Sequence, residues 1–457
     1  MKNRPRWKLH VEGLGKIREA DVEIHPLMLF VGDNDSGKSY LASLLWGLLA
    51  LQVGLERPAG PVMQECEAWL RAKLQEHPAD EAFALTADDL ALFMKLFAQS
   101  VEASQSRLVR RVFNSELVRV SRIEVRAAPA DGPPPRLALN RGDVVGNGAM
   151  VTVMTDGPSS GLASSDWGSL SMHVATHLAL SPHGNSWGYS DKGGPRAPVF
   201  LPASRTGFML LYKAIVQRQI RQLEVVDERE PRLTLTMPTI RFIEMLALGL
   251  TDQIGPYAEE ADFLEKALKG RVELSRGPGV GVNDYHYLPE GSETRLDMSL
   301  ASSLVTELAP IILVLRHMQD FPVLILEEPE AHLHPRMQRK LAQVIVRLIR
   351  KGLYVWITTH SENFCQQINN FLKIGAVEDR EKLRAELQTE LGCSYGEQDY
   401  LTPDDVSAYE FINEGDHSVV RQLKKYEDGV VMPSFNKEMI AVTREVLFLD
   451  EKVSEKE

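Results

Sequence analysis

The chain has 457 residues, of which 44% are apolar and 25% charged, the composition of an ordinary globular protein. Its net charge of −12 argues against non-specific nucleic-acid binding over the whole surface, since such binding needs an excess of positive charge. Cys66, Cys365 and Cys393 are scattered without metal-type spacing and fit a reduced compartment. With no signal peptide and no apolar run of the ~20 residues that span a bilayer, we expect a cytoplasmic protein without a membrane anchor.

The first functional motif follows the third of three short strands expected near the N-terminus, at residues 7–11, 20–24 and 27–31. It has the pattern G-x-x-x-x-G-K-S and precedes a strongly apolar helix, the strand–loop–helix context of a phosphate-binding loop. Backbone N–H groups of such a loop and the positive end of the helix dipole bind an anion. The residues expected to bind nucleotide here are Gly32, Asn34, Ser36, Gly37, Lys38 and Ser39.

The middle of the chain has a different pattern. From Pro58 to about Asn114 it is helical, and Thr86 with Asp89 forms a capping box before an apolar run. Short β-type runs follow at residues 117–120, 123–127 and 151–154, which predict a small antiparallel insert. Farther on, residues 198–202 predict a buried strand and residues 208–223 and 238–251 predict helices.

The second functional motif is a fully apolar strand, residues 323–326, that ends in Glu327 and Glu328. Neighbouring side chains on an extended chain point to opposite sides, so the two carboxylates cannot share one task. One can hold Mg²⁺ and the other can orient the water that attacks a γ-phosphate. The alternative interpretation is that both glutamates are merely solvated acids at the end of a strand. The presence of a phosphate loop in the same chain disfavours this alternative.

A third apolar strand, residues 354–357, ends in Thr358, Thr359, His360 and Ser361. Ligands of open α/β sheets bind at the carboxyl ends of the strands. We therefore expect His360 to face the γ-phosphate, although a single histidine is often structural.

Residues 295–308 predict the start of a helix whose first turn carries Ser299, Ser302 and Ser303. These serines can be ordinary helix caps, or they can present hydroxyl and N–H groups to an anion. The segment alone does not decide between the two.

The order of these motifs resembles that of the ABC-type ATPase heads of the SMC, RecF and OLD families. The closest resemblance is to the OLD-like ATPases of bacterial anti-phage and abortive-infection systems. Those carry a Glu-Glu-Pro-Glu-x-His-Leu-His-Pro run, here residues 327–335, and a Leu-Pro-Ala-Ser-Arg turn, here residues 201–205. The resemblance covers about residues 7–54 and 198–374. The signature loop departs from the family pattern, with Leu304 and Val305 where glycine is usual.

The resemblance implies an ATPase that uses ATP and Mg²⁺, with two heads that sandwich two ATP molecules. Lys38, Glu328 and His360 would be catalytic, and Ser39 with the Walker B acid Glu327 would hold the metal. Ser302 and Ser303 would reach the γ-phosphate across the interface. Arg205 would contact the nucleotide or the opposite head, or else be a buried structural arginine.

The expected fold is α/β: an ABC-ATPase-like head with a mixed sheet, flanking helices and a P-loop NTPase core, carrying a helical and small β insertion. Residues 1–57 would hold the N-terminal part of the head, residues 58–195 the insertion, residues 196–375 the rest of the head, and residues 376–457 a C-terminal α/β extension.

We expect the protein to assemble with ATP into a homodimer or a higher even-numbered oligomer. This assembly would act as a sensor or scaffold in anti-phage defence. It would control a separate effector, a toxin or a nuclease. The alternative is a RecF/SMC-like repair ATPase that binds DNA through the basic helix at residues 336–351. A transporter subunit is disfavoured by the long insertion and the atypical signature loop. Residues 411–416 resemble the start of a TOPRIM nuclease, but no Asp-x-Asp pair follows them.

Overall fold

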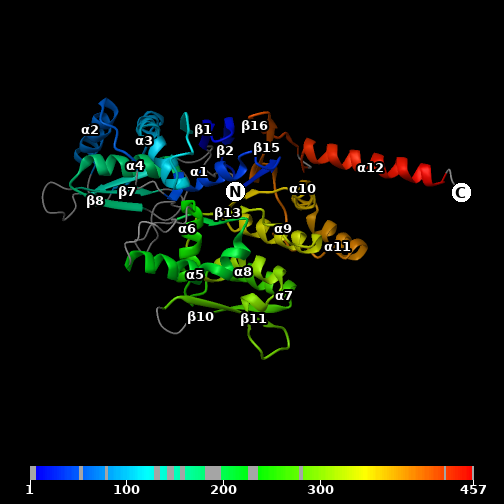
Figure 1. Cartoon of the computed structure of the whole chain (residues 1–457). Coiled ribbons are helices and arrows are strands. Elements are labelled where there is room, and N and C mark those ends of the chain that lie inside the picture. The colour runs from blue at the N-terminus through cyan, green and yellow to red at the C-terminus, as the bar shows by residue number, and fades with distance from the viewer. Residues whose placement is uncertain are drawn as a thin grey trace.

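Figure 1 shows the computed structural model of the chain, an α/β protein in which helices lie on both faces of a large sheet. The structure describes residues 7–50, 55–77, 81–127, 134–140, 149–154, 160–180, 197–224, 235–276, 281–426 and 429–454. No helix in these ranges is both long and apolar enough to cross a membrane.

The large sheet is built from nine strands: β1 (Trp7–Leu14), β2 (Ile17–Glu23), β3 (Leu27–Gly32), β5 (Arg122–Ala127), β9 (Val199–Leu201), β13 (Val323–Glu327), β14 (Tyr354–Thr358), β15 (Val406–Glu414) and β16 (His417–Gln422). Their order is β5-β1-β2-β16-β15-β3-β14-β13-β9. The run from β15 to β9 is parallel, whereas β1 pairs antiparallel with β2 and β5, and β15 pairs antiparallel with β16. This mixed sheet with flanking helices confirms the expected fold class.

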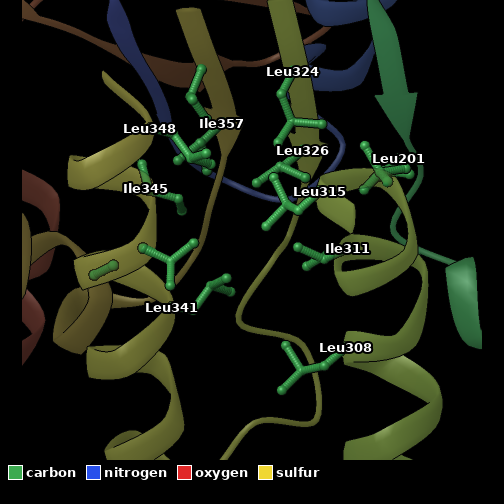
Figure 2. Close-up of a cluster of buried hydrophobic side chains, with 14 of the residues drawn as sticks. Leu201, Leu308, Ile311, Leu315, Leu324, Leu326, Leu341, Ile345, Leu348 and Ile357 are labelled. Atoms are coloured by element: carbon green, nitrogen blue, oxygen red, sulfur yellow. The ribbon is translucent and has the colours of Figure 1, made fainter. Parts of the chain in front are cut away.

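The central strands are buried on both faces, which explains why their sequences are continuously apolar. On one face, Leu324 and Leu326 pack with α8 (Ser303–His317) and α9 (Pro335–Arg350). Figure 2 shows these leucines lying close to Ile311 and Leu315 of α8. On the other face, Ile325 packs with residues of α1 (Lys38–Ala50). Each such side chain contributes about 1.5–3 kcal/mol of burial free energy, so the strand ends that carry the motifs are firmly placed.

The insertion forms a second group of elements beside the sheet (Figure 1). Its members are α2 (Pro61–Glu76), β4 (Phe83–Ala84), α3 (Ala87–Phe113), β6 (Arg136–Asn140), β7 (Ala149–Met154), β8 (Ser160–Ser164) and α4 (Trp167–Leu180). The strands make a four-stranded sheet in the order β4-β6-β7-β8. The predicted capping box is present, with Asp89 N–H donating to the Thr86 hydroxyl at 3.2 Å and Thr86 N–H donating to the Asp89 carboxylate at 2.8 Å.

Two β predictions need correction. Residues 117–120 form no strand, and Leu117 is exposed. The segment makes an isolated backbone contact, from Gly15 N–H to the Arg119 carbonyl, instead of a ladder. In contrast, β5 is a strand but pairs with β1 at the edge of the large sheet, so it does not belong to the small insert sheet.

A layer of helices and a small sheet lie next to α8 (Figure 1). It comprises α5 (Arg205–Glu224), α6 (Met237–Glu244), the π turn Met245–Gly249, α7 (Ala258–Leu268), β10 (Gly270–Arg276), β11 (Asn283–Pro289) and β12 (Leu296–Asp297). The predicted helix over residues 238–251 is thus shorter than expected, because it changes to a π turn after Glu244.

The C-terminal part of the chain completes the large sheet. β15 lies between β16 and β3, so a strand beyond residue 376 neighbours the strand that carries the phosphate loop. Residues 411–416, with their resemblance to TOPRIM, are the end of β15 and its turn into β16. The remaining elements are α10 (Glu362–Ala376), α11 (Arg380–Leu391), β17 (Lys425–Tyr426), β18 (Gly429–Val430) and α12 (Pro433–Ser454), which projects away from the body in Figure 1.

Candidate nucleotide site

The phosphate loop joins β3 to α1 and contains two glycines in the left-handed region, Gly32 at φ 119° and Gly37 at φ 95°. A Cβ at Gly32 would lie 2.1 Å from the carbonyl oxygen of Phe411, and one at Gly37 would lie 2.6 Å from Ile17 Cγ1. Both positions therefore need glycine for space as well as for conformation. Asp35 also has a positive φ, 56°, which aspartate tolerates better than most residues.

The loop is held from the C-terminal side by β15. Asp33 N–H donates to the Phe411 carbonyl at 3.1 Å, and Asn413 N–H donates to the Asp33 carboxylate at 3.0 Å. The Asn413 side-chain amide donates to the Asn34 carbonyl, also at 3.0 Å. Sequence reasoning missed Asn413, because nothing local links it to a loop 380 positions earlier.

Lys38 is buried, and its ammonium group lies inside the loop. It donates to the Gly32 carbonyl at 3.1 Å and to the Asp33 carbonyl, while the buried Ser36 hydroxyl donates to the same Asp33 carbonyl at 2.6 Å. Burial lowers the pKa of Lys38 to about 8, against the opposing effect of nearby carboxylates such as Glu328. A partly desolvated cation enclosed by a glycine loop is suited to bind an anion.

Glu327, the last residue of β13, lies against the phosphate loop. Its carboxylate accepts a hydrogen bond from Ala203 N–H at 3.3 Å and lies beside the Ser39 hydroxyl, which acts to lower its pKa. Burial raises the pKa of Glu327 above its usual range. The structure thus brings Ser39 close to Glu327, although the two residues lie far apart in the sequence. Both were expected to hold the same metal ion.

Glu328 and His360 lie next to each other at the ends of β13 and β14, with Glu328 Oε1 3.8 Å from His360 Nε2. Glu328 has a positive φ of 42°, and its N–H donates to the Thr358 carbonyl at 2.8 Å. This turn separates its half-exposed carboxylate from that of Glu327. Burial, reinforced by Lys38, lowers the pKa of His360, which favours the neutral ring at pH 7.

Glu330 is a member of the site that sequence reasoning did not single out. Its buried Oε1 accepts hydrogen bonds from the Thr359 hydroxyl at 2.6 Å, from His360 N–H at 2.8 Å and from Ser361 N–H at 3.1 Å. The carboxylate therefore fixes the turn that carries His360. Its place in the acidic run two residues after Glu328 was the available signal.

Arg205 has no exposed surface. It donates to the main-chain carbonyls of Glu327 and Glu328 and pairs with Glu307 of α8. Of the two expectations for Arg205, the structure supports a buried structural arginine.

The serines of the signature region do not all lie in one helical turn. Ser302 is the N-cap of α8, its hydroxyl accepting from Val305 N–H at 3.4 Å, and Ser303 is the first helical residue. Both are exposed. Ser299, expected in the same turn, lies instead in a separate 3₁₀ turn, Met298–Leu300, because the chain extends again at Ala301.

Three of the six basic residues at positions 336–351 form ion pairs within the protein. Arg347 forms a two-bond ion pair with the fully buried carboxylate of Asp399, at 2.7 and 3.0 Å. Arg350 pairs with Asp405, and Lys351 with Glu259 and Glu260. These three charges therefore do not belong to a free basic patch, whereas Arg336 and Arg339 of α9 are exposed.

Comparison with known proteins gives one match to a family. Residues 216–365 match the family model described as "AAA domain, putative AbiEii toxin, Type IV TA system". The matched segment includes α8, β13, α9 and β14 but not the phosphate loop, and it spans less than half of the chain. No curated protein matches.

Among solved structures, the chain is similar to an SMC head bound to the C-winged helix domain of ScpA, with 12% identity, 91% of this chain and 97% of that chain covered, and a TM-score of 0.37. It is also similar to the SMC head domain from Thermotoga maritima, with 10% identity, coverage of 92% and 100%, and a TM-score of 0.32. A third is the Smc head domain with an extended coiled coil bound to the C-terminal domain of ScpA from Pyrococcus furiosus, with 12% identity, coverage of 97% and 100%, and a TM-score of 0.35.

The family match and the site geometry lead to the same assignment. The matched segment supplies the strands that carry Glu327 and His360, and the mixed sheet brings their ends to the loop that holds Lys38. Residues 216–365 are thus similar to an AAA domain, and the fold joins this segment to a phosphate loop of the P-loop type.

Proposed function

We propose that the protein binds and hydrolyses ATP at the site formed by the phosphate loop and the ends of β13 and β14. The observation that carries this proposal is the position of the Glu327 carboxylate beside the Ser39 hydroxyl, because this contact joins the loop to the acidic strand at the place where a metal–phosphate complex would bind. Lys38 would bind the terminal phosphates, and the main-chain N–H groups of Asn34, Ser36 and Gly37 would line the anion site.

Mg²⁺ fits the residues present. A serine hydroxyl and a buried carboxylate supply the hard oxygen ligands that Mg²⁺ prefers, and a bound cation would compensate the burial of Glu327. When bound, the ion would neutralise phosphate charge. Glu328 would orient the attacking water, and the neutral His360 beside it would donate or accept a hydrogen bond at the γ-phosphate.

Substitutions separate binding from hydrolysis. Lys38→Ala should abolish ATP binding, whereas Glu328→Gln should retain binding and lower the hydrolysis rate by about 10²-fold or more, as expected for loss of a group that acts on the reacting water. ATP binding by a fluorescent analogue and phosphate release would be measured on the same samples. A Glu328→Gln protein with the wild-type rate would refute the assigned role.

We further propose that two copies sandwich two ATP molecules, with Ser302 and Ser303 of one copy at the γ-phosphate held by the other. The exposure of both serines at the N-terminus of α8 supports this, since a helix start with free surface suits an anion. Hydrolysis would then require dimers. A rate per subunit that stays constant at every dilution would contradict the sandwich.

The biological role we propose is ATP-dependent control of a separate effector, a toxin or a nuclease, in anti-phage defence. The motif order supports it, and so does the family model, whose name refers to a toxin of a type IV toxin–antitoxin system. A RecF/SMC-like repair role loses part of its support, because three of the six basic residues that favoured DNA binding, Arg347, Arg350 and Lys351, are paired with acids within the protein.

Native mass spectrometry of the tagged protein, purified with its neighbouring genes as wild type and as Glu328→Gln with Mg-ATP, tests this role. An even-numbered assembly that carries a second polypeptide would support effector control. A bare ATP-linked dimer that retains DNA would favour the repair role instead.

A further inference from the structure

The side chain of Arg205 connects three segments that are far apart in the sequence. Its Nη1 donates to the Glu327 carbonyl at 2.8 Å and to the Pro202 carbonyl at 3.4 Å. Its Nη2 donates to the Glu328 carbonyl at 3.1 Å and lies 2.9 Å from the Glu307 carboxylate, while Nε donates to the Glu307 carbonyl at 3.2 Å. One guanidinium group therefore joins the start of α5, helix α8 and the acidic turn after β13.

Packing alone does not explain this arrangement. The side chains of Arg205 and Glu307 are 0% and 1% exposed, and a buried ion pair stabilises a fold no better than an apolar pair of similar volume. What a guanidinium adds is a rigid planar fork of donors. Here the fork binds the carbonyls of Glu327 and Glu328, so it fixes the orientation of the peptide planes on which both carboxylates are mounted.

The turn at Glu328 needs such support. A non-glycine residue at positive φ persists only where its surroundings hold it, at a cost of about 1–3 kcal/mol. The Thr358 carbonyl holds the N–H side of Glu328 and Arg205 holds its carbonyl side. Glu307 also lies 4.0 Å from His332, in the same turn. The Glu307 carboxylate of α8 thus reaches the turn directly at His332 and indirectly through Arg205.

We infer that the Arg205–Glu307 pair is a positioning element that couples the first turns of α8 to the acidic turn Glu327–Glu328. The inference rests on the proposed function: in the ATP sandwich, Ser302 and Ser303 contact nucleotide held by the other copy, while the same helix positions its own Glu328. The pair therefore links the two nucleotide sites, so that ATP seated at one site changes the geometry of hydrolysis at the other.

The test is Glu307→Gln, which removes the charge of the carboxylate but keeps an acceptor. ATP affinity should stay within about twofold of wild type, because the pair does not touch the phosphate loop, and kcat should fall ~10- to 100-fold, since small displacements of reacting groups have effects of that size. The Hill coefficient for ATP should fall towards 1. Arg205→Lys, which keeps the charge but loses the fork, should behave in the same way.

Glu265→Gln is the matched control. Glu265 is equally buried and pairs with Arg316 at the other end of α8, 2.5 Å away, with no contact to the acidic turn. It should lower thermal stability to a similar extent and leave kcat and the Hill coefficient unchanged. A folded Glu307→Gln or Arg205→Lys protein with wild-type kcat and Hill coefficient would overturn the inference. The ATP hydrolysis rate of the wild-type protein tests the proposed ATPase function, and the ratio of the variant kcat to the wild-type kcat tests the coupling. Failure of the proposed function and failure of this inference are therefore distinguishable.

Discussion

The carboxylate of Glu330 lies 2.8 Å from the main-chain nitrogen of His360 and so holds the turn on which that histidine is mounted. Replacing Glu330 by alanine would leave the Thr359 hydroxyl and His360 N–H without this acceptor, while Ser361 N–H would keep its bond to the Thr359 hydroxyl at 3.0 Å. We expect the free energy of unfolding to fall by about 3 kcal/mol and kcat to fall ~100-fold, because His360 would lose its position. Chemical denaturation and phosphate release measure the two effects.

Glu330→Gln is the companion variant, since an amide oxygen can still accept these bonds. It should keep most of the activity that Glu330→Ala loses. Equal activity in both variants would show that the turn holds His360 without Glu330.

Gly32→Ala should abolish ATP binding while leaving most of the fold intact. The new Cβ would lie 2.1 Å from the Phe411 carbonyl, and alanine is strained at φ 119°. The loop must therefore move away from β15. Binding of a fluorescent ATP analogue should weaken by more than ~100-fold, the size expected when an anion-binding backbone is displaced.

Asn413→Ala probes the same contact from the other strand. It removes the side-chain hydrogen bond to Asn34, worth about 1 kcal/mol, so ATP affinity should fall about five- to tenfold. It also removes the bond that Asn413 accepts from the Ser418 hydroxyl, which does not contact the loop. Unchanged affinity would mean that the loop keeps its shape without this bond.

Reversal of charge on α9 should destabilise the protein instead of weakening DNA binding. Arg347→Glu would place a second negative charge against the buried Asp399, at a cost of about 3–5 kcal/mol. Arg336→Glu, on an exposed residue of the same helix, should change stability by less than about 0.5 kcal/mol. Denaturant titration gives both values. Loss of duplex binding in Arg336→Glu at 150 mM salt would restore the repair role.

His177 of α4 should make the insertion acid-sensitive. Its two ring nitrogens are buried and have no hydrogen-bond partner among the described residues, and burial, with a smaller effect of His173, lowers its pKa to about 3. Below pH 6.5 the unfolded chain binds a proton that the folded chain does not, so stability falls as the pH falls. Between pH 6.5 and 4.5 the loss should be about 2–3 kcal/mol.

His177→Leu should abolish this part of the pH dependence. Urea unfolding of wild type and variant at both pH values isolates the effect, because all other groups titrate alike in the two proteins. A difference between the proteins that does not change with pH would mean that His177 is solvated or paired.

The motifs that the sequence located are local. The residues of the phosphate loop, Glu327 with Glu328, and His360 each follow an apolar strand, and the strands of a parallel sheet bring their carboxyl ends together. The pairing of Ser39 with Glu327 followed from that rule. The prediction of a strand at residues 117–120 failed because β-type composition does not provide a neighbouring strand to pair with.

The supports of the site were not predictable in the same way. Arg205, Glu307 and Asn413 act through partners more than 100 residues away, and no periodicity encodes such pairs. The ion pairs of Arg347 and Arg350 were not predictable for a related reason, because Asp399 and Asp405 lie on a segment that gives no sequence signal of where it packs.

The position of β15 has a consequence for the order in which the protein can be made. The phosphate loop emerges from the ribosome early, yet the strand that supports it at Gly32 and Asp33 is synthesised about 380 residues later. Until then, β3 lacks its neighbour on that side, and the hydrogen bonds that Asp33 makes with Phe411 and Asn413 cannot form. A nascent chain therefore lacks this support of the phosphate loop until synthesis has passed residue 413.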